Sequence, residues 1–369
     1  MRPTFDPAAW QTANERDLQL RLARLRALLQ RALGHASEPF ETPPDTEMPS
    51  AAALVASLFN LSAFEADVLM LSAAAVMDSS IAALCAEMNG DPRRAAPTFG
   101  IAITILPNPH WSVLSPSAPL RYWRLLEPGP GEPLTRAPLR IEERVLHFLA
   151  GISCMDPHLE SIFSLVPHPV TLSQNEPAEA TPGDEVAGMV RLLNTRTPPV
   201  IALCGGDRQQ RLATAGEAAL ACGLRLFTAR AVDLPVEPVE RHELGRRWAR
   251  EAILSGSALL VECDGDSRTL AAFAAFAAEE NFPVFLASDI PMTVNIGRPM
   301  IRFPLKPIVN QTQQNLWRQV LGDHTTALNG YIPTLTAQFR LSPSLIRAAA
   351  EDALAALPTD PAKRELQHH

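Results

Sequence analysis

Short apolar segments in the second half of the chain alternate with polar segments of helical length. The apolar segments cover residues 200–204, 224–228, 258–261 and 284–287, with a fifth at 300–303. The stretches between the first four fit helices at 208–222, 237–255 and 267–280. Continuous apolar strands joined by helices are typical of a parallel sheet that helices cover on both faces. This alternation predicts an α/β module over residues 184–307.

The chain changes character on both sides of this module. Helical periodicity at 311–321, 333–339 and 343–356 predicts a helical lid subdomain over residues 308–357, followed by a polar tail at 358–369. Residues 167–183 are rich in proline and poor in apolar side chains, which indicates a linker in front of the module.

Residues 50–166 predict a separate and mostly helical domain. Residues 50–59 fit a first helix, Ser62 and Glu65 have the spacing of a capping box that starts a second, and a third runs from Ser79 or Ser80 to Gly90. Residues 134–141 are typical of a small hairpin, after which helical spacing returns. Short helices followed by a small β element favour a winged-helix-like domain, with a plain helical bundle as the alternative.

Residues 1–49 predict a helix and a linker. Thr12 and Glu15 form a capping-box pair that starts a helix at residue 12, and Gly34 follows its end. One face carries a regular leucine stripe that favours pairing with another helix, in this chain or in a second copy. The flanks carry Arg16, Arg21, Arg24, Arg26 and Arg31. They form either a face for nucleic acid or an acidic partner, or a solvated helix face, and we favour the solvated face.

Composition excludes several classes of protein. A length of 369 residues favours two or three domains, and a net charge of −8 does not steer the chain towards nucleic acid. The five cysteines form no C-x-x-C pair, which predicts reduced core thiols rather than zinc ligands. With no apolar signal region and no stretch of about 20 apolar residues, the sequence predicts a cytoplasmic protein without a membrane partner.

The loop after the first strand occupies the place of a phosphate-binding loop in a P-loop fold. The working pattern is G-x-x-x-x-G-K-[ST]. Aligned from Gly205, this sequence has Gln210 for the second glycine, Arg211 for the lysine and Leu212 for the hydroxyl residue. Gln210 adds bulk against phosphate, the wide Arg211 guanidinium replaces a compact ammonium, and Leu212 removes the Mg²⁺-binding hydroxyl. The loop therefore predicts weak ATP–Mg²⁺ binding at best.

Other residues complete a degenerate nucleotide site. Where a metal-ordering Asp and a catalytic Glu usually follow the third strand, this chain has Glu262 and Cys263, with Asp264 one place further. A thiol does not polarise water as a carboxylate does. The predicted nucleotide contacts are Gly205, Gly206, Arg208, Arg211, Glu262, Asp264 and Ser288. No residue is assigned a catalytic or metal-ligating role, and a tight turn with solvent-exposed arginines is the alternative interpretation.

Three arginines outside the loop are weaker candidates. Arg298 and Arg302 lie near the fifth strand, where they can reach across a subunit boundary, and Arg347 lies in the last helix, at a lid position. Roles in surface contacts or salt bridges are the alternative for Arg298 and Arg302.

Four stretches of the chain carry a family resemblance. They are LSAFEADVLMLSAAAVMD at 61–78, PLRIEERVLHFLAGI at 138–152, RRWAREAILSGSALLVECDGD at 246–266 and LTAQFRLSPSLIRAAAEDA at 335–353. In this order they resemble the N-terminal half of the AAA+ ATPases encoded beside phage-tail-like extracellular contractile injection systems in bacteria. The resemblance implies a winged-helix domain and a degenerate AAA+ module, which in the family precede a second, active module. The chain is then either a fragment of such an ATPase or a stand-alone inactive paralogue.

The loss of three phosphate-loop positions favours a non-catalytic regulatory or scaffolding part of such an ATPase. The resemblance implies that this part assists assembly or cargo loading of the injection particle. Its implied partners are injection-system components or cargo, together with an active AAA+ module or further copies of the chain. One alternative is an unusual NTPase in which Arg211 replaces the lysine. A second alternative is a winged-helix DNA-binding regulator, which the negative net charge disfavours.

Overall fold

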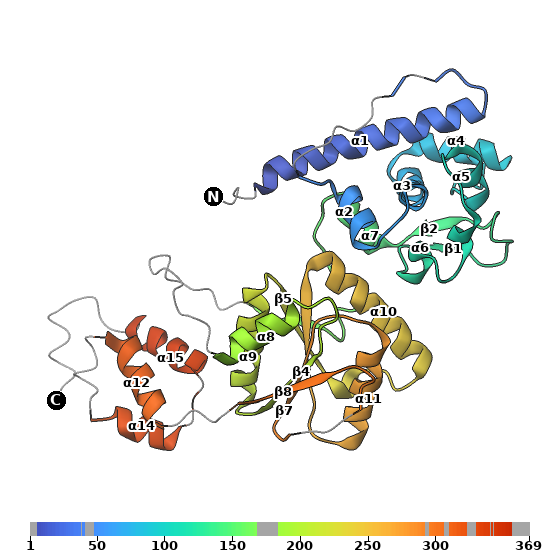
Figure 1. The fold of residues 1–369 in the computed structure, drawn as a ribbon. Coiled ribbons are helices and arrows are strands. Elements are labelled where there is room, and N and C mark those ends of the chain that lie inside the picture. The colour runs from blue at the N-terminus through green and yellow to red at the C-terminus, as the bar shows by residue number, and fades with distance from the viewer. Residues whose placement is uncertain are drawn as a thin grey trace. The chain divides into compact units, whose positions relative to one another are not determined.

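The computed structural model describes residues 6–37, 39–40, 48–167, 184–291, 295–305, 310–322, 330–339, 341 and 343–355 (Figure 1). They fall into two compact units. Unit 1 comprises Met1–Ser161 and Glu243–Ser255, and unit 2 comprises Ile162–His242 and Gly256–His369. Within the described ranges no single helix is long and apolar enough to cross a bilayer; one helix pair passes by composition, but it bends by 112°.

The first helix, α1 (Pro7–Ala32), starts earlier than the capping-box spacing predicted. Asp6 is the N-cap, and its side chain accepts hydrogen bonds from the backbone N–H of Ala8 and Ala9, with Pro7 at the first helical position. Thr12 instead donates its hydroxyl to the Ala8 carbonyl. The predicted start at Thr12 is therefore wrong, because the Asp-Pro pair offers a cap and a preset φ five residues earlier.

The leucine stripe of α1 packs inside unit 1. Its buried members Leu22, Leu25 and Leu29 join the core of that unit, and α1 contacts α3 (Ala63–Met77) and α4 (Ser79–Asn89). The leucine stripe therefore packs against helices of the same chain, which is one of the two predicted alternatives.

Three of the five arginines predicted on α1 form ion pairs within unit 1. Arg24 binds Asp67 through two hydrogen bonds of 2.7 and 2.9 Å. Arg21 pairs with Asp17 at 2.7 Å, and Arg26 pairs with Asp78. These contacts favour structural and solvated roles over a face for nucleic acid.

The rest of unit 1 has the predicted winged-helix type of organisation. The capping box of Ser62 and Glu65 is present at the start of α3, and Gly90 ends α4 in the left-handed conformation. An antiparallel hairpin follows, with Leu126 opposite Ile141, so its first strand lies before the predicted residues 134–141. The remaining elements before α10 are α2 (Ala51–Leu58), α5 (Phe99–Ile105), η1 (Trp111–Leu114), α6 (Pro119–Tyr122), β1 (Leu126–Pro128), β2 (Leu139–Ile141) and α7 (Glu143–Leu149).

A segment distant in sequence completes unit 1. Helix α10 (Pro238–Ser255) contributes its residues from Glu243 onward, and both Trp248 and Arg250 are fully buried. Glu251 holds Arg144 of α7 through hydrogen bonds of 2.8 and 3.1 Å, with both side chains at most 3% exposed. Unit 1 is therefore discontinuous in sequence.

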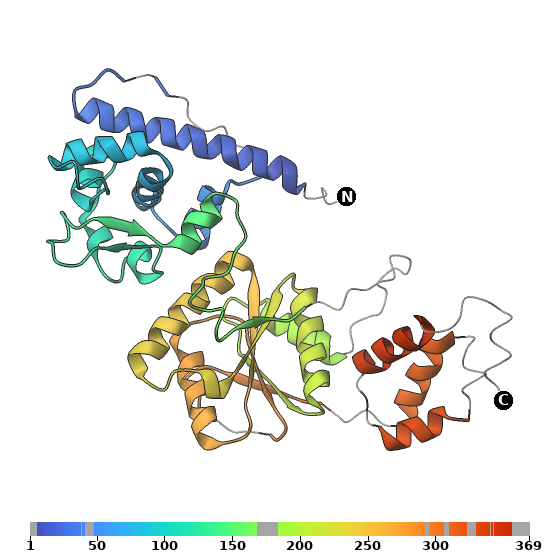
Figure 2. The same ribbon diagram turned by 180° about the vertical axis from the view of Figure 1, so that it is seen from behind.

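Unit 2 contains the predicted parallel sheet. The strands lie in the order β3-β5-β6-β7-β4-β8, and all pairs except β3–β5 are parallel. Helices α8 (Asp184–Leu193) and α9 (Arg208–Ala221) cover one face, and α11 (Ser267–Glu279) covers the other (Figures 1 and 2). The strands are β3 (Ser164–Leu165), β4 (Val200–Gly205), β5 (Arg225–Arg230), β6 (Ser257–Glu262), β7 (Val284–Ser288) and β8 (Met300–Leu305), and η2 (Ala231–Asp233) follows β5.

The C-terminal part of the described chain is a small helical cluster, as predicted for the lid. It comprises α12 (Asn310–Leu321), α14 (Ile332–Gln338) and α15 (Pro343–Ala355). Trp317, Ile332 and Ile346 form its apolar centre.

Candidate functional site

The predicted site lies where the strand order of the sheet reverses. Strand β4 comes first along the chain among the parallel strands, yet it lies between β7 and β8. Ligands of open α/β sheets bind outside the carboxyl ends of the strands at such a switch point. Cys204 lies in register with Ser288, and Glu262 lies in register with Ala287. The fold thus brings Gly205, Glu262 and Ser288 to one edge of the sheet.

The two glycines after β4 make a tight turn into α9. Gly205 and Gly206 have φ values of 79° and 62°, in the left-handed region. A Cβ on Gly205 would lie 2.9 Å from the Leu305 carbonyl oxygen, and one on Gly206 would lie 2.5 Å from the Gln210 side-chain oxygen. The Gln210 side chain therefore packs directly against the backbone of Gly206.

Asp207 caps the helix that follows this turn. Its side chain accepts a hydrogen bond of 2.7 Å from the backbone N–H of Gln210, so the chain's own carboxylate lies at the positive end of α9. The sequence interpretation missed this residue, although an aspartate directly before a helix is a common N-cap signal. The cap places a negative charge where a phosphate would bind.

Arg211 is directed back onto the loop. Its Nη1 donates to the carbonyl oxygens of Gly205 and Gly206 at 3.1 and 3.0 Å, and its Nη2 pairs with Asp289 at 2.6 Å. The Arg211 side chain is 9% exposed. The cation aligned with the phosphate-binding lysine is thus largely removed from solvent and already neutralised.

The second predicted cation, Arg208, is also paired. Its Nε and Nη2 bind the two carboxylate oxygens of Glu262 at 2.8 and 2.7 Å. This hydrogen bonding and the charge of Glu262 raise the pKa of the guanidinium. The structure brings Arg208 and Glu262 together as a salt bridge and leaves neither charge uncompensated.

The remaining predicted contacts are dispersed. Ser288 is buried and accepts from the backbone N–H of Ile290 at 3.3 Å. Burial, followed by the charge of Asp264, raises the pKa of the neighbouring Cys263 thiol to about 12. Asp264 is exposed, and within the described chain no hydrogen bond or ion pair joins it to the loop. The thiol stays protonated at neutral pH and provides no base.

The residues present do not fit a magnesium-bound triphosphate. The Asp207 carboxylate repels phosphate from the start of α9, and Arg208 and Arg211 are committed to Glu262 and Asp289. Leu212 supplies no hydroxyl for Mg²⁺. Only Gly206 and Asp207 lie between β4 and α9, so Gln210, Arg211 and Leu212 are helical residues, and the charges of the loop are satisfied internally.

The arginines proposed outside the loop do not join it. Arg298 precedes β8, and its guanidinium donates to four carbonyls, those of Pro198, Ala277, Glu280 and Phe282. Pro198 precedes β4, so Arg298 lies at the amino edge of the sheet, opposite the loop. Burial lowers its pKa to about 10. Arg302 and Arg347 are exposed side chains on β8 and α15.

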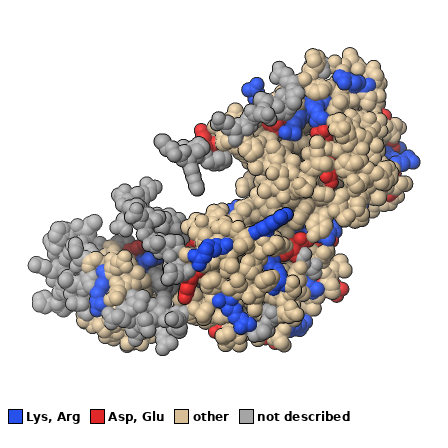
Figure 3. Space-filling model, in the orientation of Figure 1, with Lys and Arg blue, Asp and Glu red and all other residues tan. Residues whose placement is uncertain are grey.

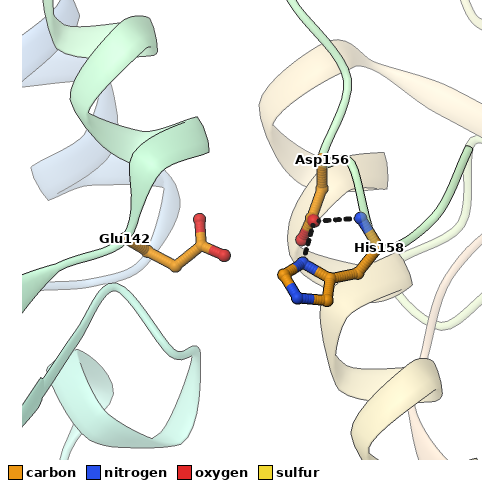
Figure 4. A group of neighbouring side chains, drawn as sticks. All are labelled: Glu142, Asp156 and His158. Atoms are coloured by element: carbon orange, nitrogen blue, oxygen red, sulfur yellow. Dashed lines mark hydrogen bonds and ion pairs between the residues drawn. The ribbon is translucent and has the colours of Figure 1, made fainter.

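One cluster in unit 1 has ligand-type side chains close together. Oxygen or nitrogen atoms of Glu142, Asp156 and His158 lie within 4.8 Å of one another (Figure 4). Arg250 pairs with Asp156 at 2.5 Å and with Glu142 at 3.2 Å, and Arg247 pairs with the same two carboxylates. Because two guanidinium groups already neutralise the carboxylates, the cluster is an ion-pair network rather than a metal centre.

Family comparisons divide the chain in agreement with this architecture. A model described as "winged helix domain, variant" matches residues 8–162, and one described as "contractile injection system ATPase helical domain" matches residues 310–369. The first match includes α1, which the sequence interpretation set apart from the winged-helix domain. A comparison with curated proteins found no match.

Among solved structures, the chain is similar to three AAA-type proteins at low identity. A structure of the FIGL-1 AAA domain with ADP shares 14% identity over 51% of this chain and 73% of that one, with a TM-score of 0.33. A katanin structure shares 16% over 47% and 65%, with a TM-score of 0.29. A Rhizobiales Trip13 structure shares 14% over 45% and 76%, with a TM-score of 0.25.

Proposed function

Because models of a contractile injection system ATPase helical domain and of a winged helix domain match this chain, we propose that it is part of a contractile injection system ATPase and that its α/β module is non-catalytic. It has an ATPase-related role and acts through protein contacts during assembly or cargo loading of the injection particle. The main support for the proposal is that side chains of this chain already satisfy the charges and hydrogen-bond donors at the loop. Asp207 caps α9, and Arg211 binds the carbonyls of Gly205 and Gly206 and the carboxylate of Asp289.

The first test measures nucleotide binding and turnover by the full chain. We expect isothermal titration with ATP and Mg²⁺ to give no binding in the micromolar range, and phosphate release to stay at the level of a buffer blank. Arg211→Ala and Glu262→Gln should leave both readouts unchanged. Micromolar binding with turnover that Arg211→Ala abolishes would support the alternative of an active NTPase and overturn the proposal.

The second test measures what the protein contributes to particle assembly or cargo loading, separately from ATP hydrolysis. In a strain that produces the injection particle, deletion of the gene should lower the number of assembled or cargo-loaded particles seen by electron microscopy. A copy carrying Glu262→Gln should restore the wild-type number, because the proposal gives this carboxylate no catalytic role. Loss of particles in the Glu262→Gln strain, at equal protein level, would contradict it.

The winged-helix domain supports a protein-binding rather than a DNA-binding role. Arg21, Arg24 and Arg26 of α1 are engaged by carboxylates, and the net charge of the chain is −8. Nucleic-acid binding depends on unpaired cations whose counterions are released. A gel-shift assay at low salt that gave a stable complex with duplex DNA would favour the regulator instead.

A further inference from the structure

A groove runs between two segments of unit 1 that no function above uses. One wall is the η1 region, with Trp111, Leu114 and the hydroxyl residues Ser112 and Ser115. The other wall is the turn between β1 and β2, with Pro133, Leu134 and Thr135. The groove encloses a volume of about 500 Å³, which lies in the range of binding pockets.

The groove exposes large apolar side chains that a folded domain usually covers. Trp111 is 69% exposed and Leu134 is 42% exposed, and they contribute to opposite walls. The hydroxyls have partners already, since Ser112 bonds to His110 and Ser115 bonds to Ser117, each at 2.8 Å. The free energy of docking here would come from burying apolar surface.

The wall formed by the turn is held in place before any partner arrives. The Pro133 carbonyl accepts from the backbone N–H of Arg136 and Ala137 at 2.8 and 2.9 Å. The Thr135 carbonyl accepts from Gly100 N–H at 2.9 Å, and a Cβ on Gly100 would lie 2.8 Å from that oxygen. A preformed wall reduces the ordering cost of binding.

The charges beside the groove indicate the kind of partner. No charged side chain lines it. Arg136 follows Thr135 and is exposed, and Arg121 donates to the Leu114 carbonyl beneath the other wall. In the described part of the chain no carboxylate pairs with either guanidinium, whereas the nearby Arg94 is paired with Glu132 at 3.1 Å. An apolar groove next to two arginines that have no carboxylate partner complements an apolar segment that carries negative charge.

We propose that this groove docks an extended peptide segment of a partner protein, with aliphatic or proline side chains next to a carboxylate. The inference names a partner class for the proposed protein-contact role. It depends on that role only for the existence of a partner. Trp111 and Leu134 hold the apolar side chains, and Arg136 and Arg121 attract the carboxylate. On the face shown in Figure 3, the surface of unit 1 carries both Lys or Arg and Asp or Glu side chains amid uncharged surface.

The test selects random twelve-residue peptides on phage against the full chain and measures the enriched peptides by fluorescence anisotropy. We expect enriched sequences to combine Leu, Ile, Val or Pro with Asp or Glu. Trp111→Ala should weaken their binding at least tenfold, and Leu134→Ser at least fivefold. Arg136→Ala should weaken it about threefold, and this loss should shrink at high salt. Val76→Ser, which alters another exposed apolar side chain of unit 1, is the control and should change nothing.

Circular dichroism checks that each variant keeps the wild-type unfolding midpoint, which is expected because Trp111 lies mostly in solvent. Enriched peptides without acidic residues, equal binding by the Trp111→Ala variant, or no enrichment would each overturn the inference. Binding of a twenty-residue oligothymidine that Trp111→Ala abolishes would assign the groove to nucleic acid and overturn it as well. Nucleotide titration of the α/β module tests a different region, so the two proposals can fail independently.

Discussion

Arg211 and Asp289 form an ion pair of 2.6 Å whose two members differ greatly in exposure. The guanidinium side chain is 9% exposed and the carboxylate side chain is 83% exposed. Because Arg211 also donates to the carbonyls of Gly205 and Gly206, the cation is fixed by the loop and Asp289 compensates it from the solvent side. The loop is thereby stable without an external anion.

Removal of the carboxylate cap of α9 should destabilise unit 2. Asp207→Ala removes the hydrogen bond to Gln210 N–H, and we expect a loss of about 1 kcal/mol in the free energy of unfolding. Urea denaturation followed by circular dichroism measures it. Asp266→Ala is a matched control, because Asp266 is the N-cap of α11 but makes no side-chain capping bond. Equal losses in the two variants would contradict the capping role.

The buried pair of Arg144 and Glu251 should couple α10 to the rest of unit 1. Glu251→Ala leaves a guanidinium that is 2% exposed without its carboxylate, and we expect a loss of about 3–5 kcal/mol. The double variant Arg144→Met with Glu251→Met should recover most of that stability, since no buried charge then remains. Chemical denaturation of the single and double variants checks both expectations. A double variant as unstable as Glu251→Ala would show that the charges themselves are required.

Acid should weaken unit 1 through Asp156. Burial disfavours its charged form, but the backbone hydrogen bond from His158 and the charges of Arg250 and Arg247 outweigh burial and lower its pKa. Because the folded pKa lies below the unfolded value of about 3.9, the stabilisation is complete above about pH 4 and is lost as pH falls through the folded pKa.

Asp156→Asn tests this dependence on pH. It should cost about 3–5 kcal/mol at pH 7, and the difference from the wild type should shrink below about pH 4. Denaturation at several pH values measures the effect. Asp17→Asn alters a more exposed pair with Arg21 and should cost at most about 1 kcal/mol. A difference for Asp156→Asn that stays constant down to pH 2 would contradict the assignment.

Arg298 should be important for the stability of unit 2 despite having no role in the loop. Arg298→Ala leaves up to four carbonyls without this donor, and we expect a loss of about 3 kcal/mol. Thermal unfolding measures the loss, with the exposed Arg268→Ala as control. An unchanged midpoint for Arg298→Ala would show that water replaces the guanidinium at no cost.

The amino-acid sequence by itself determined the alternation of parallel strands and helices in unit 2, whereas it placed the start of α1 too late. The five parallel strands and the helices α9, α10 and α11 lie within a few residues of their predicted bounds. Alternation of short apolar runs with amphipathic segments is a local signal, because strands buried on both faces need continuous apolar sequence. The substitutions Gln210, Arg211 and Leu212 could likewise be recognised from their positions after the first strand.

Only the tertiary structure decided how charges are shared and which segments pack together. Arg208 is 54 residues from Glu262, Arg144 is 107 residues from Glu251, and Arg298 binds carbonyls from two separate segments. No local periodicity encodes such pairs, because a charged side chain selects its partner by distance in the folded chain. The same holds for α10, whose helical pattern was evident but whose residues from Glu243 onward complete unit 1.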